Sequence, residues 1–509
     1  MPRDRARSGR LVLRRLAHAW PVLLIAAGSV AVLLAFAGQY GLHRDEMYFI
    51  VAGRHPDWGY VDQPPLTPLL NAISAAIFGM TTAAIRIFPA FAFGAAVLVA
   101  AATAREFGGG RRAQAIAALT LAVSGYLDAG HMNTTATYDV LGWSVVLFFV
   151  VRLVRGADTR EWILAGIAAG ITLQNKNLLV FLGLAMAAAV LITRRWDLLR
   201  SRWLWLGLAV ALLIWMPNIV WQAAHGWPQL EMARVIAARS GDENRSTLIL
   251  LQIIFAGPLL FPISVAGAWW LLRSPKAASW RPIGWSYLII LALLFLTSGK
   301  GYYSGGMLPT LMAAGAVVVD GWLDRGPILM RRAKAVSYTA ATLASAAVVV
   351  PLALPIVPVA DLANSPIPGI NSDVGNTVGW DRYVAQVTTV VDGLTPQERA
   401  QAAILTVNYG EAGALELFGR PNLPPVYSGH NSYWQWGPPG DDRTVTVLVM
   451  HWDEAGSFWG RYLGPCDRAA TIDMGLKEDM NEEQGAGVWV CRGRTTPWPE
   501  ICAAFRNIG

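Results

Sequence analysis

The chain has 509 residues, of which 54% are hydrophobic and only 15% charged, and its mean hydropathy is +0.40. Water-soluble domains carry about a quarter charged residues, so this composition excludes an ordinary soluble protein. The 22 tryptophans suit the two interfaces of a bilayer. We therefore expect a mostly α-helical, polytopic membrane protein. The net charge of +7 would also suit a nucleic-acid binder, but its distribution along the chain argues against that class.

About eleven apolar segments approach the ~20 residues that a helix needs to cross a bilayer. They cover residues 17–39, 84–104, 113–128, 138–154, 161–175, 177–193, 203–221, 248–272, 283–299, 305–322 and 335–357. The fifth and sixth are short and abut at Gln174-Asn175-Lys176-Asn177, which predicts a helical hairpin with a polar tip. The first follows a basic leader, residues 1–16, and has spanning length, so we expect an anchor helix and not a cleavable signal.

Lysine and arginine residues in the connections indicate the orientation, because they concentrate on the cytoplasmic side of a membrane. With the N-terminus inside, the leader and the inner connections hold 23 basic residues, against 7 in the outer connections. The bias predicts an inner or plasma membrane protein whose loop 40–83 and C-terminal part are extracytoplasmic. We expect a transmembrane domain over residues 17–357 and a separate domain over 358–509.

The C-terminal part, residues 358–509, differs from the rest in composition. Proline and glycine punctuate it, β-type runs occur at 403–407 and 444–450, and helical patterns occur at 380–393 and 396–401, which predicts a soluble α/β domain. It holds 10 basic and 18 acidic residues, so the positive charge belongs to the membrane half and we expect no nucleic-acid surface. All three cysteines lie here. Outside the cytoplasm we expect one disulfide, Cys466–Cys491, with three reduced thiols as the alternative.

The stretch from His43 to Leu66 follows the first span and is rich in acidic residues. It places Asp45, Glu46, Asp57 and Asp62 near the membrane surface, among Tyr48, Phe49, Trp58 and Tyr60. Charge at that depth is costly and tends to be kept for function or for a paired partner. Pro64-Pro65 then forces an extended turn before the next helix. The alternative is a solvated loop that happens to be acidic.

Further polar residues fall at the outer ends of the predicted spans. They are His131, Asn133, Asp139, Lys176, Lys300, Tyr302, Tyr303, Arg234, Arg239 and Arg245. Carboxylates and cations on one surface suit group transfer from a phosphate-linked donor. A carboxylate can take the proton of the attacking group, and cations can neutralise the departing phosphate. The sequence has no P-loop, no Rossmann glycine fingerprint and no His-Glu-x-x-His or Gly-x-Ser-x-Gly motif.

No cofactor is required by this interpretation. A hard cation such as Mg²⁺ is compatible with the carboxylates at positions 57 and 62, but it is not implied. Each candidate also has a structural alternative. Asp139 would serve as a helix-entry residue, Lys176 and Lys300 would snorkel to the interface, His131 would make a structural hydrogen bond, and the arginines of 234–245 would form a solvated helix face.

The motif Asp45-Glu46, followed by Trp58-Gly59-Tyr60-x-Asp62-x-Pro64-Pro65-Leu66, resembles the first outer loop of bacterial glycosyltransferases of the C superfamily. More narrowly, it is similar to the protein O-mannosyltransferase-like group that includes the enzyme adding aminoarabinose to lipid A. The resemblance extends to Tyr138-Asp139, to Lys176, and to Lys300, Tyr303 and Leu308-Pro309, so it covers roughly residues 10–325.

The resemblance implies a sugar on a polyprenyl phosphate as donor, inversion at the anomeric carbon, and an extracytoplasmic lipid, glycan or protein acceptor. The roles it implies are these: Asp45 as general base beside Glu46, Asp139 as a second acid, and Lys176, Lys300 and Tyr303 as holders of the lipid phosphate. Tyr60, Asp62, His131 and Arg239 are further candidates for substrate contact. The hairpin departs from the family, which more often has a small or hydroxyl residue before the lysine and glycine after it. The acceptor stays open.

Two other functional classes compete with a transferase. A transporter or channel would also want intramembrane charge, but usually with inverted repeats and broken helices at mid-membrane, and we detect no repeat in the sequence. A non-catalytic lipid-sugar binding or scaffolding protein would use the same surface without an essential carboxylate.

Overall fold

The computed structural model describes residues 2–451, 456–477 and 480–509, and the side chains of residues 2–18 and 456–458 lie outside that description. The side chains of the predicted leader, residues 1–16, therefore lie outside the described part. The chain divides into two compact units. The helical unit comprises Met1–Ala37, Arg86–Ala224 and Ile236–Leu354, and the mixed unit comprises Gly38–Ile85, His225–Val235 and Pro355–Gly509.

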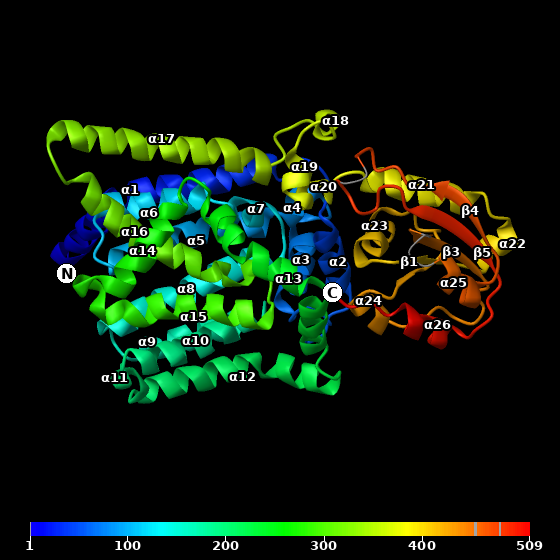
Figure 1. The fold of residues 1–509 in the computed structure, drawn as a ribbon, viewed down its shortest axis with the longest axis horizontal. Helices are drawn as coiled ribbons and strands as arrows, with labels where there is room; N and C mark the ends of the chain where they lie inside the picture. The colour runs from blue at the N-terminus through cyan, green and yellow to red at the C-terminus, as the bar shows by residue number, and fades with distance from the viewer. Residues whose placement is uncertain (1, 452–455, 478–479) are drawn as a thin grey trace. The chain divides into compact units, whose positions relative to one another are not determined.

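The helical unit is built from helices, and its long ones run in roughly the same direction (Figure 1). They are α1 (Pro2–Phe36), α5 (Ile87–Glu106), α6 (Arg111–Ala122), α7 (Tyr126–His131), α8 (Thr135–Arg155), α9 (Glu161–Leu173), α10 (Leu179–Ile192), α11 (Trp196–Leu199), α12 (Arg202–Ala224), most of α13 (Pro228–Ala256), α14 (Phe261–Arg273), α15 (Arg281–Thr297), α16 (Leu308–Leu323) and α17 (Ile328–Ala353). Two 3₁₀ segments, η1 (Pro275–Trp280) and η2 (Gly301–Met307), precede α15 and α16.

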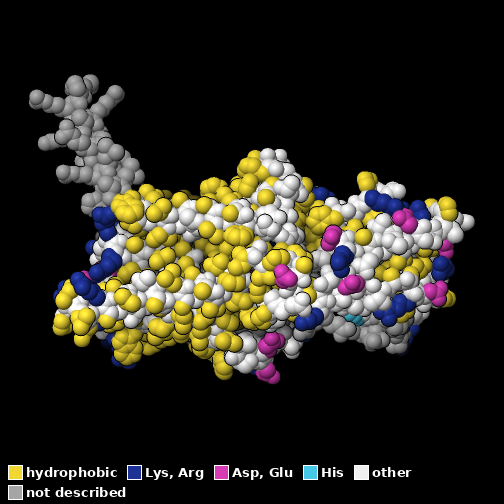
Figure 2. Space-filling model, turned by 90° about the horizontal axis from the view of Figure 1, so that it is seen from above, with side chains coloured by type: hydrophobic (Ala, Val, Ile, Leu, Met, Phe, Trp, Pro, Cys, Tyr) yellow, Lys and Arg dark blue, Asp and Glu magenta, His cyan; other side chains and the backbone are white. Residues whose placement is uncertain are grey.

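The described residues hold seven helices long and apolar enough to cross a membrane, or eight if the bent pair α13 and α14 forms one span. The predicted hairpin consists of the shorter apolar helices α9 and α10. Every predicted apolar segment contains helix, and the chain is a multi-span helical membrane protein. Hydrophobic side chains cover much of the helical unit's face in Figure 2, and Lys and Arg side chains lie at its left-hand end.

The segment 248–272, predicted as one continuous span, is broken. α13 and α14 are bent by 105° at the break. Gly257 has a φ of +83°, which favours glycine, and Pro258 cannot supply the N–H that would continue the helix. The predicted span 113–128 is also two helices, α6 and α7, and Gly125 at their junction donates its N–H to the Phe255 carbonyl at 3.1 Å. A backbone hydrogen bond thus links the α6–α7 break to the end of α13.

Close helix packing in this unit depends on glycine. Gly267 of α14 lies against the backbone of Leu311 in α16, and Gly315 of α16 lies against the backbone of Ile263 in α14. A side chain at either glycine would collide with the opposite backbone. Small residues at helix contacts allow such close approach in membranes, where apolar surface alone gives little drive for association.

The mixed unit combines residues that follow the first span with the C-terminal part of the chain. Its helices are α2 (Arg44–Arg54), α3 (Leu66–Phe78), α4 (Thr82–Ile85), α18 (Val359–Leu362), α19 (Ile367–Ile370), α20 (Ser372–Gly375), α21 (Trp380–Asp392), α22 (Pro396–Ala400), α23 (Tyr409–Phe418), α24 (Ser432–Gln435), α25 (Gly456–Leu463) and α26 (Trp498–Phe505). Its strands are β1 (Ala402–Thr406), β2 (Val426–Ser428), β3 (Val445–Met450), β4 (Cys466–Thr471) and β5 (Gly487–Arg492).

The five strands form one sheet in the order β2-β1-β3-β5-β4. β1 pairs in parallel with β2 and β3, whereas β5 pairs antiparallel with β3 and β4. Alternate residues of β3 face opposite sides, as a strand requires. Val447 packs with residues of α21 and α23, and Leu448 packs with residues of α25 and α26. The predicted mostly helical membrane protein with a C-terminal α/β part is therefore confirmed.

The helix α2 is part of the hydrophobic core of the mixed unit. Met47 and Ile50 are buried with Ile404 of β1 and Leu415 of α23. A Cβ on Gly413 would lie only 3.0 Å from the Met47 Cβ, so α2 and α23 are in close contact. The acidic loop is thus anchored on the C-terminal part of the chain.

The structure joins Cys466 and Cys491 in a disulfide, the pairing expected from the sequence, and leaves Cys502 as a thiol. The two cysteines lie opposite each other on β4 and β5, with their Cα atoms 4.0 Å apart. Burial raises the pKa of the Cys502 thiol to about 11, so it is a poor competitor for exchange with the bridge.

We expect non-reducing peptide mapping to find Cys466 linked to Cys491 and Cys502 free to alkylate after denaturation. The double variant Cys466→Ala/Cys491→Ala should lose about 2–4 kcal/mol of stability, because a loop of this length no longer restricts the unfolded chain. The single variant Cys502→Ala is the control and should unfold close to the wild type. A peptide containing Cys502 linked to either partner would contradict the pairing.

Candidate active site

In the mixed unit, a capping box fixes the start of α2 and with it the acidic pair. His43 Nδ1 accepts the N–H of Asp45 at 3.2 Å, and Glu46 Oε2 accepts the N–H of His43 at 2.8 Å. These bonds satisfy backbone donors that a helix start leaves open. Glu46 is fully buried in this role, whereas Asp45 is half-buried. Asp45 and Glu46, both predicted as catalytic, therefore differ in their availability to a substrate, because the Glu46 carboxylate is engaged by the backbone N–H of His43.

The side chain of Asp45 is oriented by a tyrosine from the C-terminal part of the chain. Tyr409 donates its hydroxyl hydrogen to Asp45 Oδ1 at 2.7 Å. Burial, and then the charge of Asp45, hold the pKa of Tyr409 well above its ordinary value, so the hydroxyl remains a donor. Tyr409 is the first residue of α23, where Asn408 Oδ1 accepts the N–H of Gly410 at 2.7 Å. The position of the Asp45 side chain is thus determined by contacts at the starts of both α2 and α23.

A second carboxylate, Asp62, belongs to the same cluster. It accepts a hydrogen bond from the Tyr48 hydroxyl at 2.7 Å, and the Tyr48 ring lies 4.7 Å from that of Tyr409. Burial raises the pKa of Asp62 to about 7, with the Tyr48 hydrogen bond opposing and the charge of Asp45 adding to the shift. A carboxyl group with a pKa near neutrality can exchange a proton at physiological pH. Asp62 is therefore a candidate for proton transfer as well as for substrate contact.

Tyr60 has a structural role that sequence reasoning did not foresee. Its hydroxyl lies 2.9 Å from the Ala52 carbonyl and 3.0 Å from that of His55, both at the end of α2. Its N–H donates to the Gln63 carbonyl at 2.8 Å. The buried ring therefore ties the loop to α2, and its hydroxyl is engaged by the backbone.

In the helical unit, the hairpin tip presents Lys176 to two aromatic rings. The Lys176 ammonium lies 5.2 Å from the Tyr302 ring centre and 5.3 Å from that of Tyr303. The Lys300 ammonium lies 5.9 Å from the Tyr302 ring. Lys176 and the segment from Lys300 to Tyr303, far apart in the sequence, are thus brought together by the α9–α10 hairpin and η2. Such ammonium groups can bind a phosphate as point charges.

The three amides around Lys176 hold the tip in place. Gln174 Nε2 donates to the Ile214 carbonyl at 2.6 Å, and Asn175 Nδ2 donates to the Thr135 carbonyl at 2.9 Å. Asn177 Oδ1 accepts the indole N–H of Trp215 at 2.9 Å. The hairpin sequence Gln-Asn-Lys-Asn, which departs from the family pattern, therefore has a physical role here. Its amide side chains fix the turn, where the family more often has small residues.

Asp139 lies buried near the start of α8 and interacts electrostatically with Lys176. Its carboxylate accepts the indole N–H of Trp143, one turn later, at 3.1 Å. The N-cap of α8 is Thr134, so the helix-entry alternative for Asp139 is not what the structure shows. The fully buried Trp143 ring also packs on Gly306, which positions η2 and its tyrosines.

His131 and Arg239, two further candidates for substrate contact, lie in the helical unit. His131 is buried, and its Nε2 lies 3.0 Å from the guanidinium of the buried Arg86. That contact matches the structural alternative for His131. Arg239 is exposed on α13, next to Ser240, whose φ of −123° interrupts the helix.

Sequence reasoning missed the tyrosine partners of the carboxylates. Asn408 and Glu411 form a capping box, and this pattern indicates a helix starting at Tyr409. No sequence signal links position 409 to Asp45, because the two are 364 residues apart. Arg44, paired with Glu482 and 6.0 Å from the Tyr409 ring centre, was missed for the same reason.

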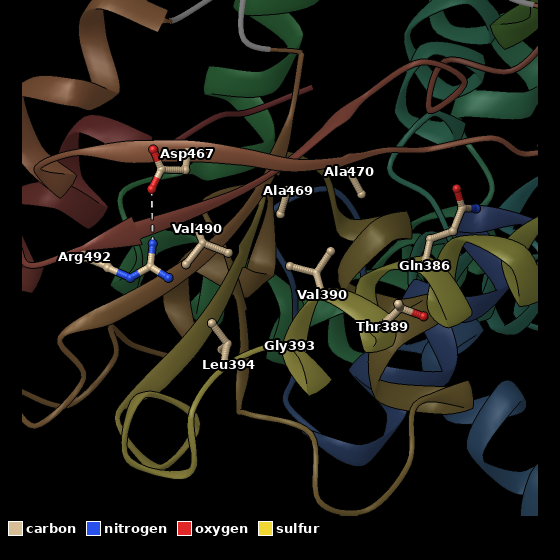
Figure 3. A pocket seen from close by; sticks show the side chains of 10 residues that line it. All are labelled: Gln386, Thr389, Val390, Gly393, Leu394, Asp467, Ala469, Ala470, Val490 and Arg492. Atoms are coloured by element: carbon tan, nitrogen blue, oxygen red, sulfur yellow. Dashed lines mark hydrogen bonds and ion pairs between the residues drawn. The ribbon is translucent and has the colours of Figure 1, made fainter.

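One hollow of the mixed unit is lined by residues that are not among the predicted site residues. Among the described residues, no group of three His, Cys, Asp or Glu side chains is arranged to hold a metal ion. A hollow of about 510 Å³ lies between α21 and strands β4 and β5 (Figure 3). Val390, Leu394 and Val490 line it, and an ion pair of 3.2 Å between Arg492 and Asp467 closes one side.

Residues 62–221 match the family model of dolichyl-phosphate-mannose-protein mannosyltransferases. A curated relative, an undecaprenyl phosphate-alpha-4-amino-4-deoxy-L-arabinose arabinosyl transferase of Pseudomonas savastanoi pv. phaseolicola, is 24% identical over 285 residues. The alignment covers 52% of each protein, so the chain spans about half the length of the curated relative it matches.

Two solved structures share the fold. ArnT from Cupriavidus metallidurans bound to undecaprenyl phosphate is 19% identical, with a TM-score of 0.59, covering 93% of this chain and 98% of that one. The same protein in the apo state is 18% identical, with a TM-score of 0.58 and coverage of 95% and 98%. The chain has the fold of ArnT, and its resemblance to the protein O-mannosyltransferase-like group of C-superfamily glycosyltransferases is confirmed.

Proposed function

We propose that this protein is a membrane glycosyltransferase that moves a sugar from a polyprenyl-phosphate donor to an extracytoplasmic acceptor with inversion. The observation that carries the proposal is the group of two lysines and two tyrosines beside Asp139, in a chain with the fold of a protein crystallised with undecaprenyl phosphate. The proposal requires no cofactor. The acceptor is an envelope lipid, glycan or protein.

The lysine–tyrosine group has the chemistry for the donor's phosphate. When the bond between the anomeric carbon and the phosphate oxygen breaks, negative charge accumulates on the departing lipid phosphate. Lys176 and Lys300 supply positive charge for it, and Tyr303 supplies a hydroxyl. The amides of the hairpin tip keep Lys176 in place, so less ordering is needed when the donor binds.

The carboxylate cluster has the chemistry for the acceptor's proton. A hydroxyl is a weak nucleophile at neutral pH, so a carboxylate must take its proton as the new glycosidic bond forms. Asp45 is assigned this role because Tyr409 orients one of its oxygens and because the family motif places the base there. Glu46 is held by the His43 backbone and is less suited to it.

The orientation is part of the proposal. The bias of 23 basic residues to 7 supports an inside N-terminus, and the disulfide between β4 and β5 supports an oxidising compartment for the mixed unit.

Asp45→Asn should lower the turnover rate by about 10²–10⁴-fold with little change in donor affinity, since general-base help is of that size. The asparagine oxygen can still accept the Tyr409 hydroxyl, so the fold should persist. The measurements are donor binding and sugar transfer, made separately on purified full-length protein in detergent. Glu46→Gln should be milder, and Asp361→Asn, an exposed carboxylate of α18, should behave as wild type.

If Asp45→Asn kept more than about a tenth of wild-type turnover, the base would lie elsewhere, and Asp139 and Asp62 would be tested next. Full transfer by the variant together with unchanged donor binding would fit a non-catalytic role for Asp45 and contradict the proposed mechanism.

Lys300→Ala should weaken donor binding about 10- to 150-fold and also slow transfer, because a charge-assisted contact to phosphate is lost in both the bound donor and the departing lipid phosphate. Lys176→Ala should act in the same direction, and Lys176→Arg should recover part of the binding. Lys276→Ala, an exposed lysine of the same unit, is the control. Unchanged donor affinity in both alanine variants would show that the phosphate binds elsewhere.

A reporter enzyme that is active only outside the cytoplasm should be active when fused after Gly509. The matched fusion of a reporter active only inside the cytoplasm should be silent. The reverse result would invert the orientation and remove the extracytoplasmic acceptor from the proposal.

A further inference from the structure

A pocket of about 440 Å³ in the mixed unit takes no part in the mechanism described so far. It opens at the C-terminal end of α2, and its lining includes Arg54, His55, Asp57, Tyr60, His225 and Trp436. Its volume lies within the range of about 300–1,000 Å³ that small-molecule sites occupy.

The pocket has aromatic walls that are held in place. The His55 ring stacks on the Trp436 indole, with centres 4.4 Å apart and planes 16° apart. The Tyr433 ring also contacts the Trp436 ring, with centres 4.6 Å apart and planes 61° apart. The Tyr60 ring is buried and fixed by its hydroxyl on the α2 backbone. These contacts position the aromatic side chains relative to one another.

The rim carries both donors and acceptors of hydrogen bonds. Arg54 is exposed and supplies several N–H donors in a plane, while the exposed Asp57 carboxylate supplies acceptors. Burial, followed by the charge of Arg54, lowers the pKa of His55. A neutral imidazole both donates and accepts, and the side chain of His225 also lines the pocket. The rim therefore suits a ligand with several hydroxyl groups better than a simple anion.

The pocket adjoins the carboxylate cluster within the same unit. Tyr48, which donates to Asp62, has its ring 6.4 Å from that of Trp436. Tyr60 lines the pocket and precedes Asp62 by two residues. A ligand held here would thus extend toward the groups assigned to proton transfer.

We propose that this pocket binds a sugar unit of the acceptor, an inference that rests on the proposed function. A sugar ring has C–H faces that pack on an aromatic wall and an edge of hydroxyls that bond to guanidinium, carboxylate and imidazole groups. Trp436 and His55 provide the wall, and Arg54 and Asp57 provide the edge contacts. The acceptor is accordingly a glycan or glycolipid.

Saturation-transfer NMR on the purified full-length protein in detergent tests the assignment without any donor present. The probes are the methyl glycosides of glucose, mannose, galactose and glucosamine. In a separate experiment, binding of inorganic phosphate is measured from the width of its phosphorus NMR line. We expect saturation transfer to at least one glycoside from the wild type. We expect Trp436→Ala to weaken its binding about tenfold or more, and Asp57→Asn to weaken it by several-fold.

Trp434→Ala is the matched control, because this exposed tryptophan lies in the neighbouring helix α24 and packs on Arg506 outside the pocket lining. If Trp436→Ala fails to fold, Asp57→Asn and His225→Gln, both at exposed positions, decide the question. Absence of transfer to every glycoside from folded wild type overturns the proposal. So does equal binding by wild type and the pocket variants, or binding of phosphate alone that is lost in Arg54→Gln.

The sugar-transfer assay separates this inference from the proposed function. Glycoside binding that depends on Trp436 supports the pocket even if the protein proves inactive as a transferase, in which case the proposed function fails alone. Full transferase activity without glycoside binding in the pocket overturns the pocket alone.

Discussion

The hydrogen bond from the Tyr409 hydroxyl to Asp45 is the interaction on which the carboxylate cluster of the mixed unit depends. It holds because α2 is buried against α23, with Met47 in the same core as strand β1. A loop that only followed a membrane helix would leave such a carboxylate mobile and solvated. Here the first loop and the C-terminal part of the chain form one folded unit, so the carboxylate has a defined direction before substrate binds.

The lysine–tyrosine group is fixed by a different kind of contact. Asn175 and Asn177 engage the backbone of α8 and the indole of Trp215, and Trp143 packs on Gly306 below the two tyrosines. Gln174, Asn175 and Asn177 thus each make a side-chain hydrogen bond that holds the turn. Lys176, which these amides flank, lies over the rings of Tyr302 and Tyr303.

Helix breaks in the helical unit show how the membrane constraint is met. A break exposes backbone donors and acceptors, which cost several kcal/mol each in hydrocarbon. The junction of α6 and α7 pairs with the junction of α13 and α14 through Gly125 and Phe255. Local hydropathy could not reveal this arrangement, because an apolar run that contains Gly257-Pro258 still has the composition of a span.

The sequence by itself determined the membrane class, the helical segments, the α/β character of the tail and the first-loop motif, because these depend on hydropathy, period and local spacing. It also indicated Asp45, Lys176 and Lys300 by their positions at predicted span ends. Only the tertiary structure decided which partner each residue has. Tyr409 orients Asp45, and Arg86 engages His131. These pairs join segments that are far apart in the sequence. Only the packing of the whole fold brings such segments together, and no local sequence pattern encodes that packing.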